Sequence, residues 1–282
     1  MIEPPPQQFL AVRVEVSHEV PTFLGLCASY EMGKWRSEQF AGYLRKQLIQ
    51  FIYPVEEWGN VNSATAEEML RKAAIAVYTT DKYQKRGEIG ELILFAIMRS
   101  HYNSIPFVSK FYFKNASNDT VKGFDGVHIV KGDVGFELWL GEAKFYTDAA
   151  SAIRDAIQSI TRFTEADYLR KEFMWIENKM RAMPSGLDDV RRLLDENRSL
   201  DEVFPTLHIP VLITYESLAV QSHTRVTDDF QQAISAELTG HFNKFKEKCR
   251  VKEISVHLIA VPLHSKKELQ DHFDRKLKGA QA

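Results

Sequence analysis

The chain has 282 residues, of which 44% are hydrophobic and 26% are charged, so it can bury one large core or two modest ones. No apolar run approaches the roughly eighteen residues of a membrane-spanning helix, which argues against a membrane protein. There are only two cysteines and no secretion-signal pattern at the N-terminus, so we expect a cytoplasmic protein. The net charge of −2 lacks the basic excess of proteins that bind nucleic acid unaided.

Residues 1–80 predict an α/β extension that carries no chemical motif. Alternating apolar residues predict a strand over 9–20, and Pro21 and Gly25 predict the turn that follows it. The helical spacing of apolar residues then predicts two helices, over 36–51 and 64–78. We expect this extension to pack against the rest of the chain or against a partner.

A helix predicted over 83–102 carries two acidic residues among apolar ones. Glu91 is expected to face protein, because it is flanked at helical spacing by Leu94, Phe95 and Met98. Glu88 lies about 60° away around the helix axis. A buried acid needs a partner or a cation. The alternative is that either residue caps the helix or pairs with Lys85 or Arg86.

Residues 121–146 predict two antiparallel strands joined by a tight turn at 131–133. In such a hairpin Asp125 and Glu142 lie nearly opposite each other, about 5 Å apart at the backbone. Lys144 shares a face with Glu142, because side chains alternate along a strand. Two carboxylates and one lysine therefore meet at the end of a largely apolar hairpin.

Two carboxylates about 4 Å apart repel each other by roughly 4 kcal/mol at an effective dielectric constant of about 20. Carboxylate oxygens are the ligands that Mg²⁺ and Mn²⁺ prefer, and a cation beside Lys144 would support metal-assisted hydrolysis. The alternative is a surface hairpin with a cross-strand ion pair worth well under about 1 kcal/mol.

Motifs of zinc hydrolases, serine hydrolases and ATPases are absent from the sequence.

The remaining pattern alternates between strands and helices. Further strands are predicted over 106–113, 208–217 and 253–263. Helices are predicted from the Asp148 cap to about residue 176, from the Thr227 cap onward, and over 266–277, with a helical insertion near 177–204. This order predicts an α/β fold with a mixed central β-sheet flanked by helices.

The spacing of Asp125 and the segment 142–144 (Glu-Ala-Lys) resembles the D-x(n)-E-x-K signature of the PD-(D/E)xK nuclease superfamily, with Phe124 in place of the usual proline. More narrowly, RGEIGE, GFDGVHIV and LGEAKFY, in this order and followed by a long helix, resemble the nuclease subunit of the Hachiman anti-phage defence system. The resemblance covers about residues 80–215 and implies a restriction-endonuclease-like core over 81–282.

This resemblance implies a divalent-metal-dependent endonuclease. Asp125 and Glu142 would bind Mg²⁺ or Mn²⁺, and Lys144 would position the attacking water. The family also places a glutamate on the helix before the core strands in the metal site. Glu91 is the first candidate for that role and Glu88 the second.

Related nucleases often place a glutamine on the helix after the lysine, near the scissile phosphate, and Gln158 is the candidate here. Arg162 stands four residues later, where RecB-like members have tyrosine. An exposed glutamine without such a role is the alternative.

The resembled system implies DNA as substrate and a helicase as the partner that controls the nuclease. The near-neutral net charge suits a subunit whose partner supplies much of the DNA binding. Two alternatives remain open. One is a catalytically inactive module of the same fold that binds nucleic acid or protein, and the other is a nuclease directed at RNA.

Overall fold

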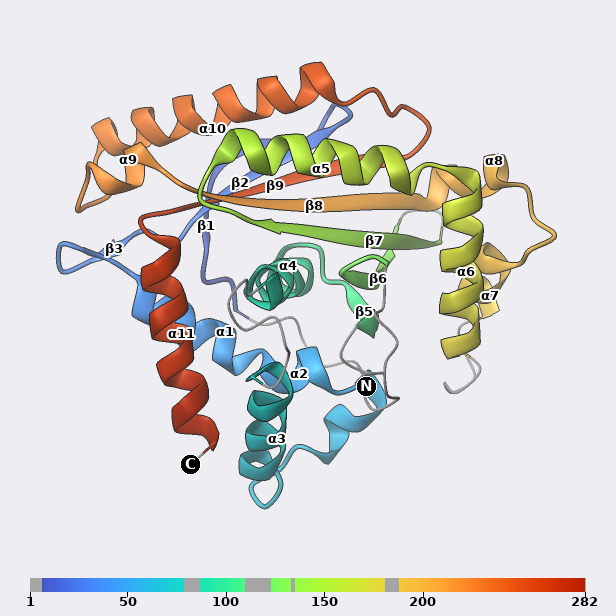
Figure 1. Cartoon of the computed structure of the whole chain (residues 1–282), viewed down its shortest axis with the longest axis horizontal. Helices are drawn as coiled ribbons and strands as arrows, with labels where there is room; N and C mark the ends of the chain where they lie inside the picture. The colour runs from blue at the N-terminus through green and yellow to red at the C-terminus, as the bar shows by residue number, and fades with distance from the viewer. Residues whose placement is uncertain (1–6, 79–86, 110–122, 133–134, 181–187, 282) are drawn as a thin grey trace.

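The computed structural model describes residues 7–78, 87–109, 123–132, 135–180 and 188–281. In this part of the chain, seven strands form one mixed sheet in the order β1-β2-β9-β8-β7-β6-β5, with helices on both faces (Figure 1). The arrangement confirms the predicted α/β fold. The strands are β1 (Ala11–Val16), β2 (Thr22–Cys27), β5 (Ile105–Ser109), β6 (Gly126–Lys131), β7 (Phe136–Phe145), β8 (Leu207–Glu216) and β9 (Ser255–Leu263), and a separate hairpin contains β3 (Tyr30–Glu31) and β4 (Lys34–Trp35).

The centre of the sheet is parallel and its two edges are antiparallel. Strands β2, β9, β8 and β7 run parallel, whereas β1 pairs antiparallel with β2, and β6 and β5 continue antiparallel beyond β7. Strand β9 is buried at every position after Ser255, as expected for a strand covered on both faces. Strand β7 therefore lies at the junction between the parallel and antiparallel parts.

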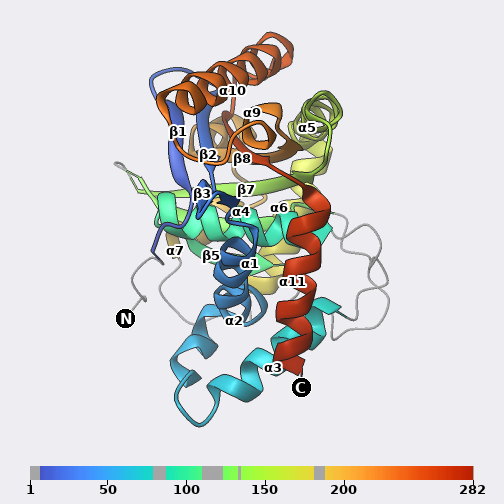
Figure 2. The same ribbon diagram turned by 90° about the vertical axis from the view of Figure 1, so that its left-hand side faces the viewer.

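The helices divide between the two faces of the sheet, and both views agree on the division (Figures 1 and 2). One face is covered by α5 (Ala149–Phe163) and α10 (Asp228–Lys248). The other face is covered by α4 (Gly87–His101), and α1 (Ser37–Lys46) and α11 (Lys266–Gln281) lie on the same side. The remaining described helices are α2 (Leu48–Ile52), α3 (Ala66–Tyr78), α6 (Ala166–Met180), α7 (Asp188–Leu194), α8 (Leu200–Val203) and α9 (Leu218–Gln221), with 3-10 turns at Val55–Asn60 and Phe204–Thr206.

Helix α4 packs unusually close to β7 because glycines stand at the contact. A Cβ added at Gly90 would lie 2.8 Å from the Cβ of Phe145, and one added at Gly141 would lie 2.9 Å from Cδ2 of Leu94. These contacts also show that Gly141, Ala143 and Phe145 face α4. The residues between them, Glu142 and Lys144, therefore face α5.

Three sequence predictions about helices and turns are wrong in detail. The predicted turn at Pro21–Gly25 is strand β2, in which Gly25 makes room for Leu238 of α10. The helix predicted over 36–51 is divided into α1 and α2. The helix predicted from Asp148 to residue 176 is interrupted after Phe163 and continues as α6.

The interruption between α5 and α6 has a cause in the apolar pattern. Buried positions in α5 follow helical spacing up to Phe163, whereas the buried positions of α6 are Leu169, Phe173 and Ile176. An unbroken helix would place residue 167 rather than residue 169 on the buried face. The break shifts the phase of the helix, so that both apolar stripes reach the core.

A hydrogen-bonded chain of side chains crosses the parallel strands near their N-terminal ends. His257 Nδ1 lies 2.8 Å from Oγ1 of Thr22, and His257 Nε2 lies 2.8 Å from Nδ1 of His208. The Trp139 ring stacks on both imidazoles, with centroid separations of 4.7 Å to His208 and 4.3 Å to His257. This cluster ties β2, β9, β8 and β7 together.

Candidate active site

The β6–β7 hairpin brings the two predicted acidic residues to the same end of the paired strands. The register pairs Gly126 with Gly141, so Asp125 and Glu142 are the next residues along the two strands. The main-chain N–H of Asp125 donates to the carbonyl of Gly141 at 2.8 Å, and its Oδ2 accepts from the N–H of Ala143 at 2.8 Å. Backbone contacts therefore fix the Asp125 carboxylate beside β7.

Glu142 is buried, with 6% of its surface exposed. Its Oε1 accepts from Lys144 Nζ at 2.5 Å and from Ser159 Oγ at 2.9 Å, so both hydrogen bonds end on one oxygen. Burial raises the pKa of Glu142, and the negative charge of Asp125 raises it further. Lys144 and Ser159 act in the opposite direction without cancelling that rise. The site therefore favours an additional positive charge.

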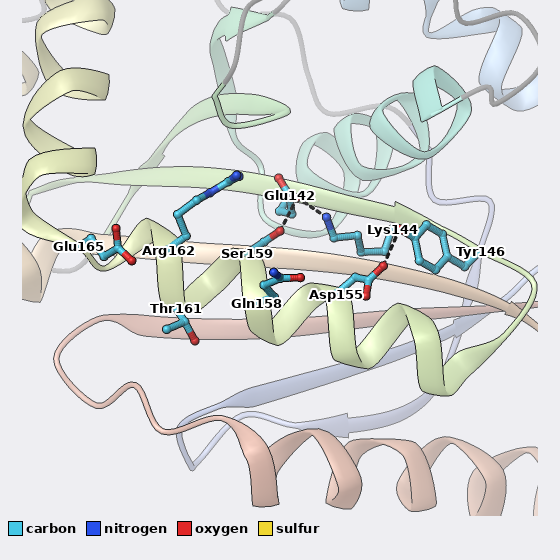
Figure 3. Close-up of a pocket in the computed structure, with 9 residues that line it drawn as sticks. All are labelled: Glu142, Lys144, Tyr146, Asp155, Gln158, Ser159, Thr161, Arg162 and Glu165. Atoms are coloured by element: carbon cyan, nitrogen blue, oxygen red, sulfur yellow. Dashed lines mark hydrogen bonds and ion pairs between the residues drawn. The ribbon is translucent and has the colours of Figure 1, made fainter.

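A cavity of about 760 Å³ opens between β7 and α5 beside this ion pair. Figure 3 shows Lys144 directed toward the Glu142 carboxylate, with the Ser159 hydroxyl below it on α5. The hydroxyl of Tyr146 donates to Oδ2 of Asp155 at 2.9 Å on the same side of the cavity. The lining residues are Glu142, Lys144, Tyr146, Asp155, Gln158, Ser159, Thr161, Arg162 and Glu165.

The candidate glutamates of α4 lie on the other face of the sheet. Glu91 lines a small cavity of about 10 Å³ together with Asp125 and His128. Glu88 is buried, with 8% of its surface exposed, one turn earlier on the helix. Glu91 and Asp125 thus line the same small cavity, and Asp125 also contacts β7, the strand that carries Glu142. In the described ranges no group of three or more His, Cys, Asp or Glu residues converges closely enough to hold a metal ion.

The donor set still fits a cation such as Mg²⁺. Magnesium keeps several of its waters and is commonly held by one or two carboxylates together with substrate phosphates. Glu142 has a raised pKa and offers Oε2 on the side that its two hydrogen-bond donors leave open. Asp125 and Glu142 are therefore the residues that would bind the ion, with Glu91 beside Asp125.

Ser159 is a site residue that the sequence analysis missed. It is buried within α5, at a position where the apolar stripe of Ala156, Ile160 and Phe163 leads one to expect a hydrophobic residue. A buried polar residue in an apolar stripe needs a hydrogen-bond partner, and this requirement could have identified Ser159 from the sequence. Gln158, the predicted glutamine, is exposed and lines the cavity without approaching Glu142 as Ser159 does.

Comparison with known proteins identifies the family to which the chain belongs. The sequence model of the HamA family matches residues 7–277. The chain is also similar to "Anti-bacteriophage protein A" of Escherichia coli (strain K12), with 21% identity over 260 residues. That alignment covers 88% of this chain and 46% of the relative, so the chain spans just under half of the relative's length. Because the family match extends over nearly all of its residues, the chain belongs to the HamA family.

Proposed function

We propose that this chain is a divalent-metal-dependent endonuclease of the PD-(D/E)xK type that hydrolyses phosphodiester bonds in DNA. The main support is the meeting of Asp125, Glu142 and Lys144 at one end of the β6–β7 hairpin. The raised pKa of the buried Glu142 adds to that support, since it indicates a site that favours a cation. An ordinary surface hairpin would not bury the Glu142–Lys144 pair beside a cavity of about 760 Å³.

Each side chain has a defined role in this proposal. Asp125 and Glu142 would hold Mg²⁺ or Mn²⁺, and Glu91, which shares the small α4-side cavity with Asp125, would contribute to the site through Asp125. A divalent cation held there would supply polarisation of a phosphoryl oxygen and a lower pKa for a water bound to it. Lys144 would orient the attacking water and stabilise the hydroxide that forms when this water loses a proton. Ser159 fixes the Glu142 carboxylate through its hydrogen bond to Oε1.

A cleavage assay with Mg²⁺ or Mn²⁺ tests this proposal on single-stranded DNA, duplex DNA and RNA. We expect Glu142→Gln and Lys144→Met to lose at least 100-fold in rate, because each removes a group that acts on the cation or on the water. Glu165→Gln is the matched acidic control, since Glu165 lines the same cavity away from the Glu142–Lys144 pair. Lys267→Met is the matched basic control, because the Lys267 side chain is 80% exposed.

The substrates also separate the alternatives. Cleavage of RNA in preference to DNA would redirect the proposal to an RNA-specific nuclease. Metal-independent binding without cutting of any substrate, even with a helicase present, would leave the inactive binding module. Cleavage that survives both Glu142→Gln and Lys144→Met would place the active site elsewhere.

We further propose that the chain acts in anti-phage defence together with a helicase subunit. The name of the Escherichia coli relative and the resemblance to the Hachiman nuclease subunit support this role. The net charge of −2 supports a partner that supplies much of the DNA binding. Phage plaque counts on cells carrying the chain, with and without a helicase encoded beside it, provide the test. Protection should require both the helicase and Glu142, and protection by Glu142→Gln would contradict the proposal.

A further inference from the structure

The last turn of α10 and the segment that follows it carry a cluster of exposed cations. Residues 244–252 contain five basic residues and one acidic residue, Glu247, in a chain whose net charge is −2. One of the five, Lys246, pairs with Glu19. The other four are exposed and, within the described part of the chain, have no carboxylate at ion-pair distance; we call them the basic patch, and they are Lys244, Lys248, Arg250 and Lys252.

The helical half of the basic patch lies on a surface that packing has fixed. Phe242 and Phe245 anchor this part of α10 in the core, with 3% and 0% of their surfaces exposed. Lys244 and Lys248 stand four residues apart, so they are neighbours on the exposed side of the helix. A lysine in the last turn also complements the helix dipole, which is a sufficient reason for Lys248 alone.

The helix dipole does not explain the other half of the basic patch, which lies beyond the end of the helix. Cys249 leaves α10 with extended backbone angles, and Cys249 and Val251 pack against the core. Arg250 and Lys252 alternate with them and are therefore directed outward. The nearby Glu253 accepts the main-chain N–H of Lys252 at 3.1 Å and forms no ion pair with its side chain within the described residues.

The opposite end of the molecule carries the opposite charge. Residues 47–70 contain four glutamates and no lysine or arginine, and all four glutamates are exposed. One of them, Glu68, pairs with Lys72, which leaves Glu56, Glu57 and Glu67. This segment leads into α3, which lies at the far end of the molecule from α10 in both views (Figures 1 and 2). A polyanion is therefore repelled at one end of the chain and attracted to the basic patch at the other.

We propose that the basic patch binds the phosphate backbone of duplex DNA at a distance from the bond that is cut. Successive cations of the patch are separated by about 6–7 Å, either as helix neighbours or as alternate residues of an extended segment. A row of this kind suits a regularly repeating anion better than a single compact one. Duplex DNA offers the densest such repeat, with one negative charge per about 1.7 Å of its axis.

This site is separate from the candidate active site, because none of its four residues lines the cavity beside Glu142. Helix α10 nevertheless covers the same face of the sheet as α5, which forms one wall of that cavity (Figure 1). The inference rests on the proposed nuclease function and adds a second place where the substrate is held. Phosphate contacts carry no base information, so binding by the patch is independent of nucleotide sequence.

The experiment measures binding of a fluorescein-labelled DNA duplex to the full chain by fluorescence anisotropy. EDTA is present, so that no divalent metal supports cleavage, and NaCl is varied from about 50 to 200 mM. The test variant carries Lys244→Gln, Lys248→Gln, Arg250→Gln and Lys252→Gln. We expect it to bind at least about tenfold more weakly at the lowest salt concentration, and the slope of log K against log [salt] to become shallower by about 3–4, which corresponds to four phosphates of duplex DNA.

The matched control removes four exposed cations of the N-terminal extension, with Lys34→Gln, Lys46→Gln, Arg71→Gln and Lys72→Gln. It changes the net charge by the same amount, and it should keep the affinity and the salt slope within about twofold of those of the parent. Circular dichroism should show that both variants melt as the parent does.

Three outcomes would each overturn the inference: a parent that binds no duplex, equal losses in the two variants, or unchanged binding by the patch variant. The last result is the one expected if the patch binds an acidic protein surface. A chain that binds DNA through the patch but never cuts it with Mg²⁺ or Mn²⁺ would instead contradict the nuclease proposal alone.

Discussion

Glu142 shows how a single carboxylate is prepared for its proposed role. Within the described part of the chain, its carboxylate accepts two hydrogen bonds, from Lys144 and Ser159, and both end on Oε1. The second oxygen is thereby directed away from both donors, and its position is set by contacts within the protein. A carboxylate held in this way needs no reorganisation when it binds a cation.

Removal of the serine hydroxyl tests this arrangement. Ser159→Ala should lower the cleavage rate by about tenfold. It should also shift the acidic limb of the pH–rate profile to higher pH, because the Ser159 hydrogen bond lowers the pKa of Glu142. Thr161→Ala is the control, since Thr161 lines the same cavity but its hydroxyl donates to the carbonyl of Ile157. An unshifted profile in Ser159→Ala would count against a positioning role.

The same carboxylate should cost stability at neutral pH. Burial and the Asp125 charge raise the pKa of Glu142 above its ordinary value, so the folded state binds this proton more tightly than the unfolded state. Proton binding by Glu142 therefore stabilises the folded state. This contribution is complete below the unfolded-state pKa of the carboxyl group and is lost as the pH rises through its folded-state pKa. Glu142→Gln should therefore raise the melting temperature at pH 7.5, by about 1–3 °C. Differential scanning calorimetry without divalent metal measures this, and a clear decrease would show that the Lys144 ion pair outweighs burial.

The packing of helix α4 on strand β7 places Glu91 near Asp125. A methyl group at Gly90 would lie 2.8 Å from the Cβ of Phe145, so Gly90→Ala must push the helix away from the strand. We expect a net loss of about 1–3 kcal/mol in the free energy of unfolding, despite the better helix propensity of alanine. Urea unfolding gives this value.

Gly240→Ala in α10 provides the matched comparison. Apart from the backbone of its own helix and its chain neighbours, no heavy atom of the described residues lies within 4 Å of a Cβ built at Gly240, so only the propensity gain of up to about 1 kcal/mol applies. If Gly90→Ala were as stable as Gly240→Ala, α4 would not pack on β7 as described.

The elements also show what the sequence could and could not predict. The β6–β7 hairpin was predictable, because side chains on paired strands alternate with period two, and this period placed Asp125 opposite Glu142. The break in the helix after Phe163 was not predictable, since it depends on which row of apolar side chains of α6 packs into the core. The side of the sheet on which α4 carries Glu91 follows from tertiary packing, about which local periodicity says nothing.

For the molecule as a whole, two buried histidines should set the acid limit of stability. Burial lowers the pKa of His128 to about 3 and that of His257 to about 3. The positive charge of Arg99 adds to the effect at His128, and His208 adds to it at His257. Both imidazoles are therefore neutral in the folded protein over the whole range in which an unfolded histidine takes up a proton.

At these two histidines the unfolded state binds more protons than the folded state between about pH 3 and pH 6.5, so their contribution to stability rises with pH across that window and levels off above it. At pH 5 each histidine should lower the free energy of unfolding by on the order of 1–2 kcal/mol relative to its value at pH 7.5. Urea unfolding at pH 5.0, 6.0 and 7.5 checks this expectation. Equal stability at pH 5.0 and 7.5 would contradict it.

The order of strands in the sheet has a consequence for biosynthesis. Among the described strands, β9 comes last in the sequence, yet it lies between β2 and β8, which leave the ribosome earlier. The two earlier strands must stay apart, or separate again, until residue 263 has emerged. The Glu142–Lys144 pair of a nascent chain therefore lies on a sheet that still lacks β9, and any property that depends on the complete sheet waits until this strand has emerged.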